Sequence, residues 1–335
     1  MKPIPSACAT GSLPILFIVG PTGVGKTRLA IQLARHLQTE IISADSRQVY
    51  RLLDIGTAKP TAEEQQLAPH HLIDLVWPDQ EFSVADYLAH FREVLGGFLD
   101  SHRLPLVVGG TGLYVQAVTR GLFEGPGADW DLRQELEELA QKNGPLALHL
   151  RLQEIDPAAA QAIHPHDRRR IIRALEVYQL TQTPISCLQR EKTSPELSLP
   201  FVTWGLMRDR PDLYERIERR VDLMLEIGLE EEVQGLLERG YPEGLNALQA
   251  FGYRDLIGYL RGRQTRAEAI QHFKRDTRRY AKRQLTWFAK EGPMAPSTSW
   301  SSHPGRIHWF NLTRTPEEEV LASMIEMVGS LRDGR

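Results

Sequence analysis

The chain has 335 residues, of which 41% are hydrophobic and 25% are charged, and its formal net charge is −3. This composition is that of an ordinary globular protein, and the length suits one large domain or a core domain that carries an insertion. The overall charge gives no sign of nucleic-acid binding, although a local basic patch remains compatible with it.

The two cysteines, Cys8 and Cys187, lie far apart and have no histidines at metal-ligand spacing, which indicates a reduced, intracellular protein without structural zinc. The apolar stretch from Leu13 to Val19 follows Lys2, but it is short and leads into a glycine-rich loop instead of a cleavage site. We interpret it as a buried strand and not as a signal peptide. No apolar run approaches the length of a membrane span. We therefore expect a cytoplasmic, monomeric protein with a flexible tail at residues 1–12.

A phosphate-binding loop follows this first strand. It matches the pattern G-x-x-x-x-G-K-[ST] in full, precedes a helical stretch, and consists of Gly20, Pro21, Thr22, Gly23, Val24, Gly25, Lys26 and Thr27. Glycines let backbone N–H groups point at phosphate oxygens, and the helix N-terminus and Lys26 add positive charge, while the Thr27 hydroxyl can ligate Mg²⁺. The motif predicts a phosphate site but leaves open whether the phosphates belong to ATP, GTP or another compound.

Polar residues follow two further predicted strands. Residues 40–44 form a short apolar strand that ends at Asp45, and residues 104–108 form another that ends at a glycine-rich turn with Thr111. Ligands of an open parallel sheet bind beyond the carboxyl ends of its strands, so Asp45 is a candidate for chemistry and Thr111 can offer a hydroxyl beside it. The second turn is also compatible with a role in packing alone. Between these strands, a possible third strand spans residues 73–76, and the apolar spacing after Ser83 predicts a helix over residues 83–99.

From residue 121 to about residue 200, the alternation of strands and helices gives way to helices alone, predicted at residues 131–142, 146–155, 157–164 and 167–180. We interpret this region as an all-helical insertion in an α/β core. The last of these helices begins with a basic cluster from Arg168 to Arg173. Such a cluster suits a solvated helix face as well as it suits contacts with a nucleic-acid backbone.

The chain then returns to the sheet with a predicted strand at residues 201–206. The helix predicted at residues 212–227 places Arg216 and Arg220 four positions apart and hence close together. Two guanidiniums on one side can clamp a diphosphate, although paired surface arginines usually face solvent. A possible edge strand at residues 306–310 and a helix at residues 316–331 complete the core.

The most basic stretch runs from Arg254 to Lys290 and contains eleven Lys and Arg residues against three Asp and Glu residues. Aromatic residues interleave with these charges, a pattern that suits binding of a structured RNA. Phe273, Tyr280 and Trp287 are seven positions apart, so we interpret them as a core stripe and the charges as functional.

Four motifs together closely resemble the bacterial tRNA dimethylallyltransferases. They read I-S-A-D-S-R-Q-V-Y at residues 42–50, D-I-G-T-A-K-P at 54–60, V-V-G-G-T-G-L-Y at 107–114 and A-K-R-Q-L-T-W-F at 281–288. Enzymes of this family transfer a dimethylallyl group from dimethylallyl diphosphate to N6 of adenosine 37 in tRNAs that read codons beginning with U, and release diphosphate with Mg²⁺ present. The resemblance implies an α/β fold with a P-loop NTPase-like parallel sheet core at residues 13–120 and 201–335, and an all-helical insertion domain at residues 121–200 that contacts tRNA.

The resemblance also implies roles for individual residues. Asp45 would be the general base near the N6 amine, Thr111 would lie at the reaction channel, and Arg216 would steady the diphosphate held by the phosphate loop. Gln48 is a hypothetical reader of an adenine edge, because an amide can both donate and accept. The implied tRNA contacts are Asp45, Ser46, Arg47, Gln48, Arg169, Arg170, Ile171, Ile172 and Arg173.

Two departures from the family pattern stand out. Gly23 and Val24 replace a frequent Ala-Ser pair, and Leu52 stands where the family usually has glycine. Neither change removes a group with a chemical role, but Leu52 bears on the shape of its loop.

Three alternative functions share some of these features. A small-molecule kinase has the same phosphate loop and an adjacent aspartate, and a prenyltransferase acting on free AMP or ADP has the same donor chemistry. A non-catalytic, nucleotide-gated RNA-binding protein also fits the phosphate loop and the basic stretch. The helical insertion and that basic stretch favour the tRNA-modifying enzyme.

Overall fold

The computed structural model describes residues 13–123, 125–190, 199–290 and 307–332. The chain divides into two compact units, Met1–Ala117 with Ser198–Arg335, and Val118–Leu197. The predicted tail at residues 1–12 lies outside the described residues, as does the first residue of the predicted edge strand. None of the described helices is long and apolar enough to cross a membrane.

The first unit is built on a sheet of six parallel strands in the order β3-β2-β4-β1-β5-β6. The strands are β1 (Ile15–Val19), β2 (Ile41–Ala44), β3 (His70–His71), β4 (Leu106–Gly109), β5 (Phe201–Met207) and β6 (Ile307–Asn311). All five residues of β1 are buried, as a strand flanked on both sides and covered on both faces requires. Because the strands are parallel, β1, β2, β4 and β5 all end at one edge of the sheet.

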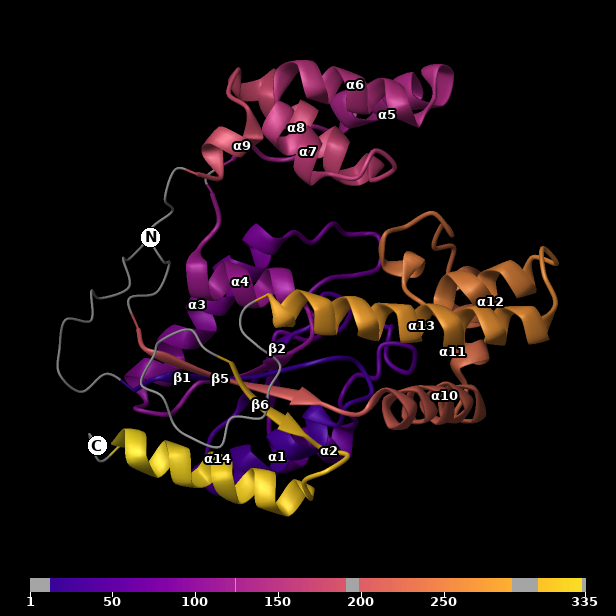
Figure 1. The fold of residues 1–335 in the computed structure, drawn as a ribbon. Coiled ribbons are helices and arrows are strands. Elements are labelled where there is room, and N and C mark those ends of the chain that lie inside the picture. The colour runs from indigo at the N-terminus through magenta and orange to yellow at the C-terminus, as the bar shows by residue number, and fades with distance from the viewer. Residues whose placement is uncertain (1–12, 124, 191–198, 291–306, 333–335) are drawn as a thin grey trace. The chain divides into compact units, whose positions relative to one another are not determined.

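Helices cover both faces of this sheet (Figure 1). α1 (Lys26–Leu37) and α14 (Glu317–Arg332) pack together on one face, and α3 (Val84–Asp100) and α13 (Arg266–Ala289) lie on the other. Ser83 caps α3 as expected, because its side chain accepts from the Asp86 N–H. The other helices of this unit are α2 (Ala62–Leu67), α10 (Arg210–Glu226), α11 (Leu229–Glu238) and α12 (Tyr253–Leu260), with a 3-10 turn at Ala247–Gln249. The predicted α/β fold is confirmed.

One strand prediction is wrong. The third strand is β3 at His70–His71, and of the predicted segment at residues 73–76 only Val76 pairs, in an isolated bridge with Tyr50. Leu72 and Asp74 have φ angles of 61° and 54°, in the left-handed region, which breaks the extended chain.

The second unit consists of helices. They are α5 (Trp130–Asn143), α6 (Pro145–Ile155), α7 (Pro157–Ala162), α8 (Arg168–Thr181) and the short α9 (Ile185–Leu188), and α4 (Gly112–Arg120) leads into the unit from the sheet. The first four correspond to the predicted helices, whereas α9 was not predicted. Their apolar faces form a core of their own around Leu148, Leu152 and Leu175.

A buried carboxylate is the centre of a network of ion pairs and hydrogen bonds in this second unit. The side chain of Glu176 is 0% exposed and receives hydrogen bonds from Arg133 Nε at 2.8 Å, Arg173 Nη1 at 2.5 Å and the Asp129 N–H at 2.8 Å. Burial alone would raise the pKa of this carboxyl group, but the hydrogen bonds from Arg133 and Arg173 outweigh it and lower the pKa. Glu176 is therefore held as a charged, fully paired group.

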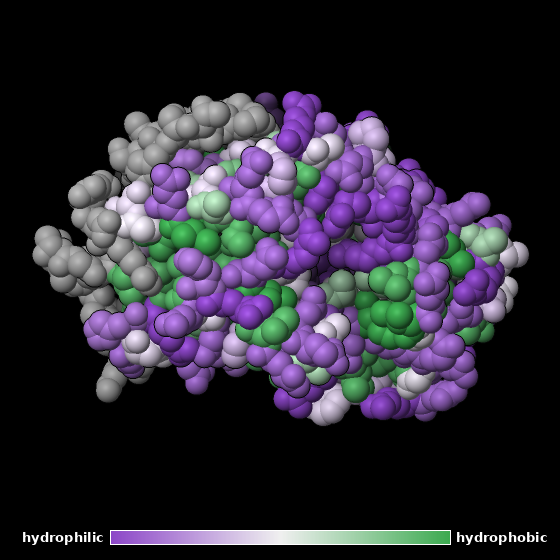
Figure 2. Space-filling model, turned by 90° about the horizontal axis from the view of Figure 1, so that it is seen from below, coloured by the Kyte–Doolittle hydropathy of each residue, from purple (hydrophilic) through white to green (hydrophobic). Residues whose placement is uncertain are grey.

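Hydrophilic residues predominate on the face of the molecule seen in Figure 2, and hydrophobic residues gather there in separate patches. Among the large hydrophobic side chains exposed on the described part of the first unit are Leu223 of α10 and Ile227, which follows that helix.

Glu176→Gln is expected to lower the free energy of unfolding of the second unit by about 3 kcal/mol, because removing one partner of a buried ion pair leaves the other uncompensated. Glu137→Gln is the control, since Glu137 pairs with Arg168 in a contact whose side chains are 39% and 40% exposed, and its loss should cost less than about 1 kcal/mol. Urea unfolding followed by circular dichroism measures both values. Equal destabilisation by the two substitutions would contradict the assignment.

Candidate active site

The phosphate loop is packed so tightly that two of its glycines cannot be replaced without strain. Gly20 has φ 145°, and an added Cβ would lie 2.4 Å from the Leu206 carbonyl oxygen at the end of β5. Gly23 has φ 82°, and an added Cβ would lie 2.9 Å from Ile217 Cγ1 of α10. The loop is therefore fixed against β5 and α10, and glycine at position 23 suits the left-handed backbone there.

Three cationic side chains converge on this loop. Lys26 Nζ donates to the carbonyl oxygens of Gly20 and Pro21, both at 2.9 Å. Arg216 Nε donates to the Gly23 carbonyl oxygen at 3.1 Å, and Arg220 donates to the Thr22 hydroxyl. No carboxylate in the described part of the chain forms an ion pair with any of the three. Both arginines of the predicted clamp thus face the loop, whereas the neighbouring Arg219 pairs with Glu215 and is exposed.

Burial and mutual repulsion lower the pKa values of these cations. Burial lowers the pKa of Lys26 to about 7, with a smaller lowering from Arg220 that Asp45 opposes. Burial also lowers the pKa of Arg216 and of Arg220. A bound anion would offset both the burial of these cations and their mutual repulsion. The loop therefore favours a multiply charged anion.

Asp45 and Thr111 meet at the same edge of the sheet, as expected from their places after β2 and β4. The Thr111 N–H donates to the Ala44 carbonyl oxygen at 3.1 Å, and the Ser46 N–H donates to Thr111 Oγ1 at 3.0 Å. Asp45 Oδ1 accepts from the Arg47 N–H at 2.8 Å. The carboxylate of Asp45 lies close enough to Lys26 and Arg220 to affect the pKa of each. The structure thus brings the candidate base beside the phosphate loop.

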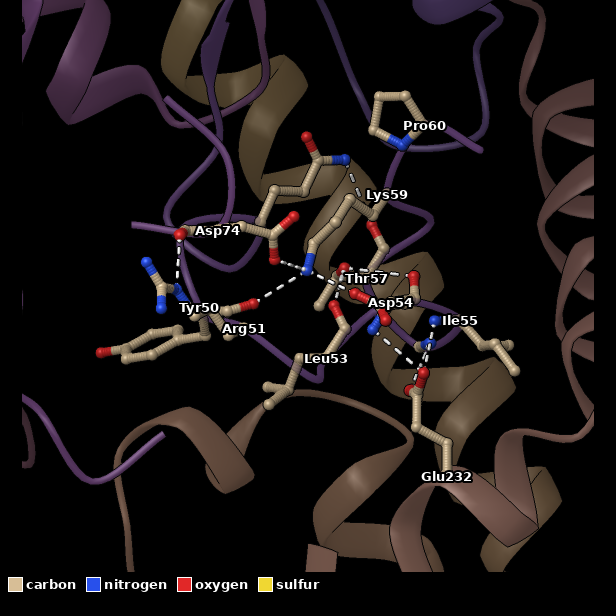
Figure 3. A network of polar contacts seen from close by, with 12 residues as sticks. Tyr50, Arg51, Leu53, Asp54, Ile55, Thr57, Lys59, Pro60, Asp74 and Glu232 are labelled. Carbon is tan, nitrogen blue, oxygen red and sulfur yellow. Dashed lines mark hydrogen bonds and ion pairs between the residues drawn. The ribbon is translucent and has the colours of Figure 1, made fainter. Parts of the chain in front are cut away.

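A network of polar contacts holds the D-I-G-T-A-K-P segment in place (Figure 3). Lys59 is buried, and its Nζ donates to the Tyr50 carbonyl oxygen at 2.9 Å, to Asp54 Oδ1 at 2.5 Å and to Asp74 Oδ1 at 2.6 Å. Glu232 of α11 accepts from the successive N–H groups of Asp54 at 3.0 Å and Ile55 at 2.8 Å. These charged contacts fix the segment against Tyr50, Asp74 and α11.

Gln48 also binds the D-I-G-T-A-K-P segment. Its Oε1 accepts from Ser43 Oγ at 3.0 Å, and its Nε2 donates to the Ala58 carbonyl oxygen at 3.1 Å. Because Nε2 also lies 3.4 Å from the Thr57 carbonyl oxygen, the amide must give up a donor bond to read an adenine edge with both its ends. Leu52, the departure from the family pattern, has φ 67°, so the loop keeps a left-handed residue there without glycine, at a cost of about 1 kcal/mol.

The basic cluster of the second unit divides by exposure. Arg169 and Arg170 are exposed, whereas Arg173 binds Glu176 and the Pro126 carbonyl oxygen. Ile171 and Ile172 are only 0% and 8% exposed within the core of their unit. Burial therefore contradicts tRNA contact through these two side chains, because α8 turns its apolar face inward.

Many positive charges of the basic stretch from Arg254 to Lys290 are paired with carboxylates. Carboxylates of α10 and α11 form ion pairs with this stretch. The pairs are Lys274–Asp222 at 2.6 Å, Arg278–Glu218, and Arg266–Glu230 at 2.8 Å. Three further arginines, Arg254, Arg275 and Arg279, share Asp276. By contrast, Lys282 and Arg283 are exposed and have no carboxylate partner among the described residues.

The aromatic stripe of α13 is only partly a core stripe. Phe273 is 3% exposed, as expected. Tyr280 and Trp287 instead face the glycine-rich turn after β4, since Tyr280 lies close enough to Thr111 for that residue to affect its pKa and an added Cβ at Gly112 would meet the Trp287 ring. Burial, followed by the charge of Asp45, raises the pKa of Tyr280 to about 12.

Sequence reasoning missed two more residues of this site. Arg208 follows β5, is almost fully buried, and donates to the carbonyl oxygens of Val24 at 2.9 Å and Leu312 at 3.0 Å. Its position directly after a strand was the available signal. Gln284 of α13 bonds both the phosphate loop and Gly110; its place in the A-K-R-Q-L-T-W-F motif was the available signal.

Comparison with known proteins now decides the class of this site. A family model described as IPP transferase matches residues 48–291. The chain belongs to the IPP transferase family. A second family model, isopentenyl transferase, matches residues 13–74. The resemblance inferred from the four motifs is confirmed, and the chain belongs with transferases of isopentenyl groups and not with kinases, which transfer phosphoryl groups.

Relatives match nearly the whole chain. A protein of Symbiobacterium thermophilum named tRNA dimethylallyltransferase is 51% identical over 302 residues, which are 90% of this chain and 90% of that protein. Its namesake from Syntrophobacter fumaroxidans is 48% identical over 323 residues, 96% of this chain and 90% of that protein.

Solved structures agree in fold. The tRNA isopentenylpyrophosphate transferase of Bacillus halodurans is 41% identical with a TM-score of 0.69, over 96% of this chain and 98% of that one. A eukaryotic dimethylallyltransferase described as acting on tRNA is 26% identical with a TM-score of 0.77, over 97% of this chain and 80% of that one.

Binding of dimethylallyl diphosphate is expected to weaken as the pH rises above 7. The free Lys26 side chain has a pKa of about 7, so it becomes neutral above that pH, whereas a bound anion raises the pKa and draws a proton onto it. The loss of affinity is limited to about tenfold per pH unit. Calorimetric titration at pH 8 in two buffers of different ionisation enthalpy measures the proton uptake. Lys26→Arg is the control, because a guanidinium stays charged, and equal uptake by both proteins would contradict the prediction.

Proposed function

We propose that this enzyme transfers the dimethylallyl group of dimethylallyl diphosphate to N6 of adenosine 37 in tRNA and releases diphosphate. The observation that carries this proposal is the convergence of Lys26, Arg216 and Arg220 on the phosphate loop, with Asp45 beside them and no paired carboxylate among the described residues. An allylic carbon ionises readily when its departing diphosphate is stabilised, and the three cations supply that stabilisation as charge develops on the leaving oxygen.

Asp45 acts as the general base in this proposal. The exocyclic amine of adenine is a weak nucleophile, so Asp45 takes its proton while the new C–N bond forms and the C–O bond to diphosphate breaks. Thr111 stands beside Asp45 at the end of β4 and lines the path of the amine. The adenine must leave the stack of the anticodon loop to reach this point.

The residues of the loop fit a Mg²⁺ ion carried by the diphosphate. The described residues offer no cluster of three or more histidine, cysteine or carboxylate ligands, and Mg²⁺ is usually held by substrate phosphates and few protein groups. The Thr27 hydroxyl at the start of α1 is the protein group that would hold it. The ion would supply additional neutralisation of the leaving diphosphate.

Contacts with tRNA involve the turn from Asp45 to Gln48, the exposed Arg169 and Arg170, and the free cations Lys282 and Arg283 in this proposal. Arg283 stacks over the rings of Phe251 and Tyr280, at 5.9 and 5.7 Å from their centroids. Guanidiniums and aromatic rings of this kind suit unstacked RNA bases.

Asp45→Asn is expected to lower the rate of transfer by about 10² to 10⁴-fold, the usual contribution of a general base, while most of the RNA affinity is retained because the other tRNA contacts remain. The amide keeps an oxygen that can accept from the Arg47 N–H, so the turn is preserved. Mass spectrometry of an anticodon stem-loop, incubated with dimethylallyl diphosphate, measures the addition of one prenyl group to one adenosine. Fluorescence anisotropy measures binding of the same RNA, and a parallel loss of affinity would make Asp45 a positioning residue.

A competition experiment separates tRNA from free nucleotides as the acceptor. The stem-loop is expected to be prenylated in the presence of excess AMP, because the cations outside the loop bind an RNA backbone and not a single nucleotide. Preferential prenylation of AMP would support the adenylate prenyltransferase instead.

A further inference from the structure

One face of α13 packs against the glycine-rich turn after β4. Tyr280 lies close to Thr111, Gln284 Nε2 donates to the Gly110 carbonyl oxygen at 2.9 Å, and the ring of Trp287 lies against Gly112. Positions 280, 284 and 287 follow one another at helical spacing, so they form a single row on the helix. The turn that carries Thr111 is therefore held by α13 along its whole length.

Gln284 alone in this row also reaches the phosphate loop. Its Oε1 accepts from the Thr22 N–H at 2.8 Å. The side chain is 6% exposed, and an added Cβ at Gly110 would lie 2.2 Å from its Nε2. One buried amide thus joins the two loops, with its acceptor used by the first and its donor by the second.

We infer that Gln284 is a positioning residue that fixes the phosphate loop relative to the Thr111 turn. It thereby aligns the leaving diphosphate on the loop with the amine beside the turn. This inference rests on the proposed function. Alignment of the reacting atoms matters because a displacement of about 1 Å can lower a rate by 10²-fold. Only a neutral group with one donor end and one acceptor end satisfies both backbone partners. A carboxylate would face the Gly110 carbonyl oxygen, and a hydrocarbon would leave both backbone groups without this partner.

Gln284→Met is expected to lower kcat by about 10 to 100-fold, while KM for dimethylallyl diphosphate and for the stem-loop changes by less than about threefold. Gln271→Met is the matched control, since Gln271 lies exposed on the same helix. Thermal unfolding by circular dichroism checks that each variant is folded at the assay temperature. A change confined to KM, or a loss of kcat that follows the unfolded fraction, would overturn the inference.

Gln284→Glu provides a pH-dependent rescue. A protonated carboxyl group has one O–H donor and one carbonyl acceptor, as the amide has, and burial raises the pKa of a glutamate introduced here. The ratio of kcat of this variant to kcat of the parent enzyme is expected to rise as the pH falls from 8 to 6, whereas the ratio for Gln284→Met stays constant. Taking the ratio removes the pH dependence that both proteins share.

The two outcomes separate the inference from the proposed function. Prenylation of the stem-loop by the parent enzyme tests the function, and the pH dependence of the ratio tests the role of Gln284. A ratio that is flat for Gln284→Glu, in an enzyme that prenylates the stem-loop, would overturn the inference and leave the function intact.

Discussion

Unpaired positive charge at the phosphate loop is the constraint on which the site depends. Lys26, Arg216 and Arg220 are held by carbonyl and hydroxyl oxygens and not by described carboxylates. Burial lowers the pKa of Lys26 to about 7, and these dipolar partners compensate this deficit less than a paired counter-charge would. The fold maintains this arrangement because the loop is fixed between β1, β5 and α10. A site with this built-in deficit favours a diphosphate, and favours it most when the diphosphate carries the extra charge of a leaving group.

The parallel sheet explains how this charge comes to lie beside a base. The phosphate loop follows β1, Asp45 follows β2, and Thr111 follows β4, which lies between β1 and β2 in the sheet. The Thr111 turn therefore contacts the Asp45 turn directly, through the bond from the Ser46 N–H to Thr111 Oγ1. A kinase with the same loop would transfer a phosphoryl group to its acceptor. In the proposed reaction the phosphates leave, so the same cations act on the group that departs.

Much of this could be predicted from the sequence, because the signals were local. The phosphate loop, the helix capped by Ser83 and the candidates Asp45 and Thr111 were each marked by a few adjacent residues and by their places after buried strands. The basic stretch was overestimated because its partners are distant in sequence. Asp222, Glu218 and Glu230 come from other helices, and composition within residues 254–290 could not reveal them. The third strand was misplaced because nothing in the apolar pattern of residues 73–76 reports the left-handed backbone at Leu72 and Asp74.

The seven-residue spacing on α13 shows a different limit. A helix face that packs on a core and a helix face that packs on a site have the same period, so Phe273, Tyr280 and Trp287 form one series in the sequence. What separates them is the partner. Phe273 lies among buried apolar side chains, whereas Tyr280 and Trp287 lie against a turn whose glycines leave room for them. Gln284, a polar residue on the same row, is the member that a core could not accommodate without two backbone partners. Its buried amide therefore marks the face of α13 that aligns the site, while Ala281 and Phe288 of the same helix remain buried in the interior.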